Sequence, residues 1–201
     1  MEYAIKAKPA DFLAPSEVVD SNHPEIVAQA GALKTPDPIE TARLSFEFVR
    51  DSVRHSSDCK LNPVTCRASD VLKERVGYCY AKSHMLAALL RANNIPAGLC
   101  YQRIAMNAEA TAFCLHGLNA VFLPEFGWYR IDPRGNRDGI NAQFDPPNEK
   151  LAFELTNSHE YDVPGIFDVP LPAVVQCLVA NQDWEDAYAN LPDLPGRTVD
   201  E

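Results

Sequence analysis

The sequence predicts an α+β fold in which one buried helix packs against an antiparallel sheet. Residues 78–93 are rich in Ala, Leu and Met and are apolar nearly all round, as expected for a central helix. After this helix the pattern changes to that of strands, over residues 97–104, 113–123 and 128–132. The last two strands are joined by a turn with the sequence Pro-Glu-Phe-Gly. We therefore expect them to pair antiparallel.

Length and composition point to one domain. The chain has 201 residues and a mass of 22.2 kDa, which is the usual size of a single domain. Hydrophobic residues make up 46% and charged residues 23%, so the composition is that of a globular chain rather than a disordered one. We expect a domain that folds on its own, without internal repeats or linkers.

The charge balance argues against anionic partners. The chain carries 28 acidic and 18 basic residues, which gives a formal net charge of −10. A polyanion would be repelled unless the basic residues gathered on one face. We therefore expect neither nucleic acid nor an anionic membrane surface as a partner.

The cytosol is the expected compartment. The longest uninterrupted apolar run, Met85 to Leu90, is too short to span a bilayer, and the first residues lack the pattern of a secretory signal. Six cysteines are too few for a disulfide scaffold in a chain of this length. Most should be free thiols, although Cys59 and Cys66 could close a small loop under oxidation.

Helices are expected on both sides of this central region. Residues 1–22 show no sustained period and are expected to be extended chain. Pro24 suits the first position of one helix, and Asp37-Pro38 opens a second, mostly buried helix. The remaining expected elements are a short helix ending near Glu74, a weak strand over 150–155, and short helices near 171–180 and 182–190.

Cys79 has the position of a nucleophile. It falls in the first turn of the central helix, where free N–H groups and the helix dipole favour a thiolate. A lone cysteine in an apolar helix is more often a small core residue, so the assignment depends on a base and an orienting acid nearby.

His116 and Asp132 are the expected base and orienting acid. His84 follows Cys79 by five residues on the same helix and therefore points roughly 140° away. By contrast, His116 and Asp132 are equidistant from Pro124 in the predicted turn, which places them opposite each other in an antiparallel pair. Asp132 could then hold the His116 ring while its other nitrogen faces Cys79, as acyl transfer requires.

Four segments together resemble a known family. They are residues 75–79 (RVGYC), 86–96, 116–121 (HGLNAV) and 127–133 (GWYRIDP). The pattern resembles the transglutaminase-like superfamily of papain-fold cysteine enzymes, over about residues 58–136. The resemblance implies a papain-like cysteine proteinase fold, with a Cys79 nucleophile, a His116 base, an Asp132 orienting residue and no cofactor.

The resemblance and the expected elements on either side of it together give a domain layout. A single transglutaminase-like domain over 1–201 would hold N-terminal helices at 23–54, the catalytic core at about 58–136 and a C-terminal extension at 137–201. The animal crosslinking enzymes of this family are far longer, so the chain is more similar to small bacterial and archaeal relatives that include predicted peptidases and amidases.

Two functions are compatible with these residues. The first is a cysteine-dependent amide hydrolase or acyltransferase that acts on peptide or side-chain amides through a thioester on Cys79. The alternative is a catalytically silent papain-like module that binds a peptide or a protein. A silent module has no need of all three residues, which favours the enzyme. The acyl donor, the acceptor and the oligomeric state do not follow from the sequence.

Other polar residues are weaker candidates. His55 lies in the region from which related enzymes supply a side-chain donor to the oxyanion, although an exposed loop histidine is an alternative. Cys59, Cys66 and the Cys114-Leu115-His116 segment lack the spacing of zinc sites, so we expect no metal. Three arginines near Asp132 could bind a substrate carboxylate: Arg130, Arg134 and Arg137. Such residues more often form ion pairs with nearby acidic side chains.

Overall fold

Helices and strands follow one another in the order expected for an α+β fold. The structure is a computed structural model that describes residues 8–195. Its helices are η1 (Pro9–Phe12), α1 (Pro24–Leu33), α2 (Pro38–Ser52), α3 (Ser56–Cys59), α4 (Ala68–Glu74), α5 (Cys79–Ala92), α6 (Pro172–Ala180) and α7 (Trp184–Ala189). Its strands are β1 (Arg54–His55), β2 (Val76–Gly77), β3 (Ala97–Ala105), β4 (Phe113–Leu123), β5 (Gly127–Ile131), β6 (Gln143–Asp145), β7 (Asn148–Lys150) and β8 (Tyr161–Asp162).

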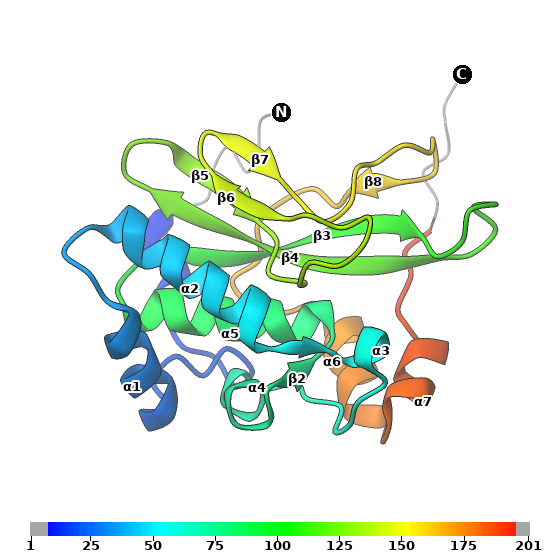
Figure 1. The fold of residues 1–201 in the computed structure, drawn as a ribbon, viewed down its shortest axis with the longest axis horizontal. Coiled ribbons are helices and arrows are strands. Elements are labelled where there is room, and N and C mark those ends of the chain that lie inside the picture. The colour runs from blue at the N-terminus through cyan, green and yellow to red at the C-terminus, as the bar shows by residue number, and fades with distance from the viewer. Residues whose placement is uncertain (1–7, 196–201) are drawn as a thin grey trace.

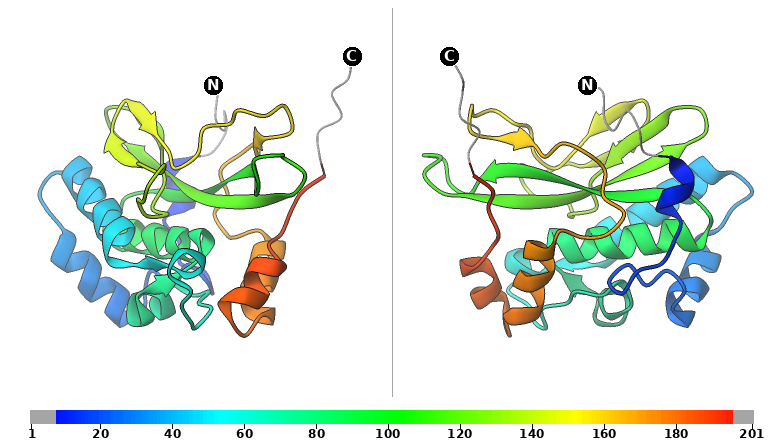
Figure 2. Two further views of the ribbon diagram at one scale, coloured as in Figure 1. Left: turned by 45° about the vertical axis from the view of Figure 1, so that its right-hand side comes forward. Right: turned by 180° about the vertical axis from the view of Figure 1, so that it is seen from behind.

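The main sheet has four strands in the order β5-β4-β3-β8, and each neighbouring pair is antiparallel. Figure 1 shows the helices α1 and α3–α7 gathered beneath this sheet, with α5 running along its underside and α2 in front of α5. In Figure 2, α1 and α2 stand on one side of α5, and α6 and α7 stand on the other. The predicted arrangement of a central helix packed on an antiparallel sheet is confirmed.

Helix α5 is the centre of the molecule. Every residue from Cys79 to Arg91 is buried, and the helix contacts α1, α2, α4, β3 and β4. An element surrounded on all sides needs an apolar surface on all sides, which the Ala and Leu content of α5 provides. The helix begins one residue later than predicted, with Tyr78 as the residue before its first turn.

The N-terminal helices begin where the sequence predicts. In α1, Pro24 is the first residue and the preceding His23 side chain accepts a hydrogen bond from the Glu25 amide. In α2, Asp37 Oδ1 accepts from the Ile39 amide at 2.9 Å. These caps satisfy N–H groups that a helix start leaves free. Between residues 8 and 22 only the short η1 is helical, and the rest of the predicted extended stretch, residues 1–7, lies outside the described residues.

The predicted register of the β4–β5 hairpin is wrong by two residues. The structure pairs Leu123 with Gly127 and Asn119 with Ile131, so the hairpin is centred on Glu125 and His116 is not opposite Asp132. The cause is a three-residue loop followed by Gly127 at a φ of +74°. A glycine in this left-handed conformation closes such loops at little cost, and the loop at residues 124–126 centres the hairpin one residue later than predicted, which shifts the pairing by two.

The region after β5 differs in part from the prediction. The expected strand over 150–155 is wrong. A small β6–β7 hairpin ends at Lys150, and the chain that follows forms no strand until β8. Two expected helices are confirmed as α6 and α7. In the described residues the six cysteines are all free thiols, including Cys59 and Cys66. None of the helices in residues 8–195 is long and apolar enough to cross a membrane.

Candidate active site

Cys79 lies at the start of α5, against the edge of β4. Its Sγ accepts a hydrogen bond from the Gly117 amide at 3.5 Å. Strand β5 pairs with β4 only as far as Asn119. On the edge of β4 that faces β5, residues before Asn119 therefore have no neighbouring strand, and the start of α5 lies against this edge at Gly117. Gly117 allows the approach, because a Cβ there would lie 2.8 Å from a ring carbon of Tyr80. The sequence therefore positions the thiol by a glycine on the facing strand.

His116 joins Cys79 to Asp132. Its Nε2 lies 2.7 Å from Asp132 Oδ2, and the ring also hydrogen-bonds the Cys79 side chain. Because Nε2 faces the carboxylate, the nitrogen toward Cys79 is Nδ1. The Phe153 ring meets the imidazole edge-on at 4.9 Å between centroids. The structure thus brings the three predicted site residues together. His116 and Asp132 are not directly opposite each other in the β4–β5 hairpin, but contact each other diagonally across its open end.

Asp132 is held as an anion at the end of β5. Its Oδ1 accepts from the Arg134 amide at 3.1 Å and its Oδ2 accepts from the Ala152 amide at 3.0 Å. Burial alone would raise the pKa of this carboxyl, but the charge of His116 and the hydrogen bonds lower it below its ordinary value. A carboxylate that stays ionised orients and stabilises the imidazole and does not itself take a proton.

The His116 imidazole favours its protonated form. Burial alone would lower its pKa, but the charges of Asp132 and Cys79, and hydrogen bonds to both, raise the pKa to about 10. An imidazolium between a thiol and a carboxylate is the arrangement in which a cysteine nucleophile is activated. Neither Asp132 nor His116 is more than 2% exposed, so water does not screen these interactions.

His55 lies beside the same site. The two-residue strands β1 and β2 pair in parallel, with His55 next to Gly77, and the imidazole packs edge-on against Tyr78. The side chain is 8% exposed, so the alternative of an exposed loop histidine is wrong. Burial, with the charge of Arg134 next, holds its pKa well below the ordinary value, so the ring is neutral and carries one N–H. The Ser57 hydroxyl lies 3.2 Å from Nδ1.

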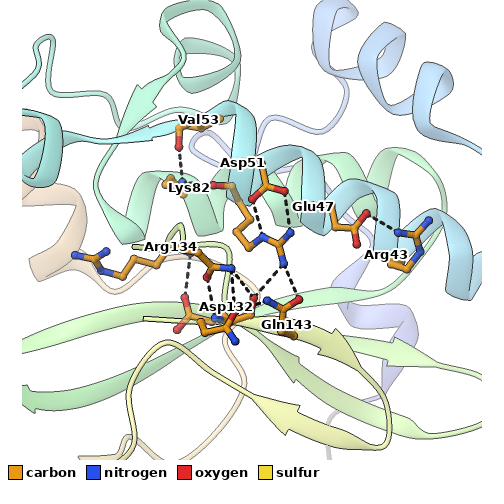
Figure 3. A network of polar contacts seen from close by, with 12 residues as sticks. Arg43, Glu47, Asp51, Val53, Lys82, Asp132, Arg134 and Gln143 are labelled. Carbon is orange, nitrogen blue, oxygen red and sulfur yellow. Dashed lines mark hydrogen bonds and ion pairs between the residues drawn. The ribbon is translucent and has the colours of Figure 1, made fainter. Parts of the chain in front are cut away.

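An ion pair between Arg134 and Asp58 connects His55 to Asp132. Both guanidinium NH2 groups of Arg134 reach the Asp58 carboxylate, at 2.7 and 2.9 Å, and Asp58 lies 3.8 Å from His55 Nδ1. Figure 3 shows Arg134 next to Asp132, with its guanidinium extending away. The residues of this pair are 76 positions apart, and no local pattern indicates their contact. Of the three arginines noted in the sequence, Arg130 also pairs with acids.

Comparison with known proteins decides the family. The profile described as the transglutaminase-like superfamily matches residues 27–133, which is more than half of the 201-residue chain. The chain belongs to the transglutaminase-like superfamily. The resemblance seen in the sequence is confirmed, and with it the membership of a family of papain-like cysteine enzymes and modules. No curated protein matches the sequence.

Solved structures align with about two thirds of this transglutaminase-like chain. A candidate cysteine protease of Cytophaga hutchinsonii aligns with a TM-score of 0.51 and 21% identity, over 65% of this chain and 44% of that one. The periplasmic domain of TgpA from Pseudomonas aeruginosa aligns with a TM-score of 0.48 and 21% identity, over 64% of this chain and 48% of that one. This chain therefore spans less than half the length of either.

A cavity of about 160 Å³ reaches Cys79 and His116 in the transglutaminase-like site. Its polar wall comes from the α3 region and the segment after β5: His55, Ser57, Arg134 and Arg137. Its apolar wall comes from the ends of β3 and β4, the segment after β7 and the C-terminal region: Ile104, Met106, Leu115, Phe153, Tyr188 and Leu191. A space of this size accommodates a group about as large as a benzene ring.

The sequence did not indicate several residues that shape this site. The segment expected to be a strand over 150–155 supplies the Ala152 amide and the Phe153 ring instead. The C-terminal chain covers the β4 edge, where Pro192 accepts a hydrogen bond from the Leu115 amide at 2.7 Å.

Within residues 8–195, no group of three or more His, Cys, Asp or Glu side chains could hold a metal.

Proposed function

We propose that the protein is a cysteine-dependent amide hydrolase or acyltransferase that acts through Cys79, His116 and Asp132. The observation that carries the proposal is the buried His116 ring, which hydrogen-bonds Asp132 at 2.7 Å through one nitrogen and Cys79 through the other. A nucleophile, a base and an orienting acid in this geometry are what acyl transfer needs. Membership of the transglutaminase-like superfamily supports the same chemistry.

The first half-reaction would form a thioester. The Cys79 thiolate attacks the carbonyl carbon of an amide, a C–S bond forms, and the carbonyl electron pair moves to oxygen. His116 then gives its Nδ1 proton to the amide nitrogen, the C–N bond breaks, and the amine leaves. Asp132 keeps the ring in the required orientation throughout, because its pKa is lowered and it stays ionised.

The second half-reaction would release the acyl group. Water or an amine attacks the thioester carbonyl, and neutral His116 takes the proton of the attacking group. The C–S bond breaks and the electron pair returns to Cys79, so the enzyme regains its starting state. Attack by water makes the protein a hydrolase, and attack by an amine makes it an acyltransferase. Both uses need the same three side chains.

The negatively charged oxygen of each tetrahedral intermediate needs donors. The Cys79 amide at the helix start is one. We propose the His55 imidazole as the second, because it is neutral, buried beside Tyr78 and lines the cavity that reaches Cys79. If the Ser57 hydroxyl donates to Nδ1, the ring N–H is on Nε2.

We propose a peptide or another amide as the substrate. The small cavity with one apolar wall suits a side chain or a short acyl group rather than a polymer duplex. The net charge of −10 argues against nucleic acid and anionic membranes as partners. A single transglutaminase-like domain and a cytosolic location, which would keep the thiols reduced, stay predictions.

The proposal is tested by trapping the acyl group. The protein is incubated with a library of amides, esters and amine acceptors, and intact-mass and peptide mass spectrometry follow adducts and products. We expect an acyl adduct on Cys79 that water or an amine removes, and no adduct at this position in Cys79→Ala. Turnover that persists in Cys79→Ala would contradict the proposal. Peptide binding without any adduct would instead favour the silent binding module.

A further inference from the structure

A second pocket, of about 470 Å³, adjoins the catalytic cavity. Five cationic side chains line it and define what we call the cationic pocket: Arg50, Arg54, Lys82, Arg134 and Arg137. Only two acids, Asp51 and Asp58, line it as well. The two spaces share His55, Arg134 and Arg137. In a chain with a net charge of −10, a positive excess beside the candidate nucleophile is a local feature that the overall composition does not predict.

Three of the five cations have structural partners. Arg50 pairs with Asp51 through two hydrogen bonds of 2.7 and 2.8 Å, and Arg134 pairs with Asp58 in the same two-pronged way. The buried Lys82 ammonium donates to main-chain carbonyl groups at the end of α2, as Figure 3 shows. These contacts neutralise both acids and hold the walls of the cationic pocket in place.

Arg137 and Arg54 have guanidinium groups that are available to bind a ligand. The Arg137 side chain is 54% exposed, and its one ion pair with a described acid is a 3.4 Å contact with Asp58 Oδ2. That oxygen already accepts from Arg134 at 2.7 Å, so Arg137 keeps most of its donors. Arg54 is exposed and forms no ion pair with an acid among residues 8–195. Pairing with nearby acidic residues therefore does not explain the presence of these two arginines in the pocket.

We propose that the cationic pocket binds a carboxylate of the substrate, with Arg137 as the principal contact because it lines both spaces. A guanidinium presents paired N–H donors that match a carboxylate. The substrate would then be an acidic peptide or amide, with the carboxylate a few bonds from the carbonyl that Cys79 attacks. This inference rests on the proposed function and adds to it the charge of the substrate.

Two thiol reagents of nearly equal size but different charge test the inference. Iodoacetate carries a carboxylate and iodoacetamide is neutral, so the ratio of their alkylation rates, divided by the same ratio for the uncharged reference thiol N-acetylcysteine amide, measures attraction of a carboxylate. Mass spectrometry follows Cys79 and, separately, the exposed Cys59, which also lines the cationic pocket. We expect a normalised ratio above one at Cys79 in low salt, which falls as salt screens the charges.

The variant Arg137→Gln isolates the proposed contact. We expect the normalised ratio at Cys79 to fall about three- to tenfold, the effect of removing one nearby charge at a partly screened site. Lys73→Gln is the matched control, because this exposed lysine on α4 pairs only with its neighbour Glu74 among the described acids, and its loss should leave the ratio unchanged. Circular dichroism checks that both variants fold.

The outcomes separate the two proposals. An unchanged ratio in Arg137→Gln at a reactive Cys79 overturns the inference and leaves the proposed function standing. A Cys79 that reacts no faster than N-acetylcysteine amide, together with a raised ratio at Cys59 that Arg137→Gln abolishes, overturns the proposed function and retains a carboxylate site. Normalised ratios of one at both cysteines overturn the inference.

Discussion

His116 Nε2 and Asp132 Oδ2 lie 2.7 Å apart in a region that water does not reach. The two residues come from the facing strand ends of one hairpin, where the last backbone pair is Asn119 with Ile131. Asp132 therefore sits one residue beyond the ladder and reaches His116 diagonally on the same face of the sheet. The contact stabilises the charged form of both groups, since the pKa of the imidazole is raised and that of the carboxyl is lowered.

Replacement of Asp132 by Asn should lower turnover without removing the nucleophile. The amide has no charge to hold the imidazolium and favours the wrong tautomer of His116. In serine-based triads the equivalent change costs about 10⁴ in rate. We expect a smaller loss here, because a thiol is intrinsically more acidic than a hydroxyl. The measurement is kcat/KM on a substrate found by the trapping experiment, with Cys79→Ala as the inactive reference.

The same pair predicts how stability depends on pH. The His116 pKa is about 10 in the folded protein and about 6.5 in the unfolded chain. The folded state therefore binds the extra proton between these values, so the stabilisation is full below about pH 6.5 and is lost as the pH rises toward 10. We expect the free energy of unfolding of the wild type to fall over this range by on the order of a few kcal/mol relative to His116→Gln.

The comparison with His116→Gln is needed because Lys82 has the opposite effect. Burial lowers the pKa of Lys82 to about 7, so its contribution to stability rises with pH above that value. Both proteins keep Lys82, and the difference between their denaturant melts removes its contribution. Parallel curves for the two proteins from neutral to alkaline pH would contradict the raised pKa of His116.

Truncation of Leu86 tests the central place of α5. Leu86 is fully buried in this helix, which contacts the helices α1, α2 and α4 and the strands β2, β3 and β4. Leu86→Ala should lower the free energy of unfolding by about 2–5 kcal/mol, because it removes apolar contact and leaves a cavity. Val179→Ala on α6 is a suitable control, since this side chain is 70% exposed and should change stability by less than about 0.5 kcal/mol.

Replacement of His55 by Ala should affect catalysis but not the reactivity of the thiol. If the imidazole donates to the oxyanion, its loss should reduce kcat by about 10²–10³. Alkylation of Cys79 by iodoacetamide passes through no oxyanion, so its rate should stay close to that of the wild type. A variant that alkylates more slowly but turns over substrate normally would show that His55 acts on the thiol instead.

The main features of the fold follow from the sequence because they depend on local pattern. The helix that begins at Cys79 is recognisable from an apolar surface on all sides, and β3, β4 and β5 from alternation. The approximate meeting of His116 and Asp132 follows from hairpin connectivity, since two strands joined by a short turn must pair. Even with the register wrong by two residues, both side chains stay on the same face, because side chains alternate with a period of two.

Other features depend on contacts between distant segments or on a single backbone angle. The left-handed conformation of Gly127 sets the hairpin register, and a turn sequence alone leaves the loop length open. The neutral state of His55 depends on its burial and on Arg134, which is held by Asp58. Ala152 and Phe153 reach the site from a segment without regular structure. No periodic pattern marks such residues, so sequence reasoning did not find them.

The central claim is that His116 and Asp132 activate Cys79, and the rate of Cys79 alkylation as a function of pH tests it most directly. Iodoacetamide labelling of the wild type, His116→Ala and Asp132→Asn is followed by peptide mass spectrometry from acid to alkaline pH. We predict fast labelling of the wild type at neutral pH, a rise displaced to alkaline pH in His116→Ala, and a smaller displacement in Asp132→Asn. If both variants keep the wild-type profile, the pair does not activate Cys79 and the account of the site is wrong.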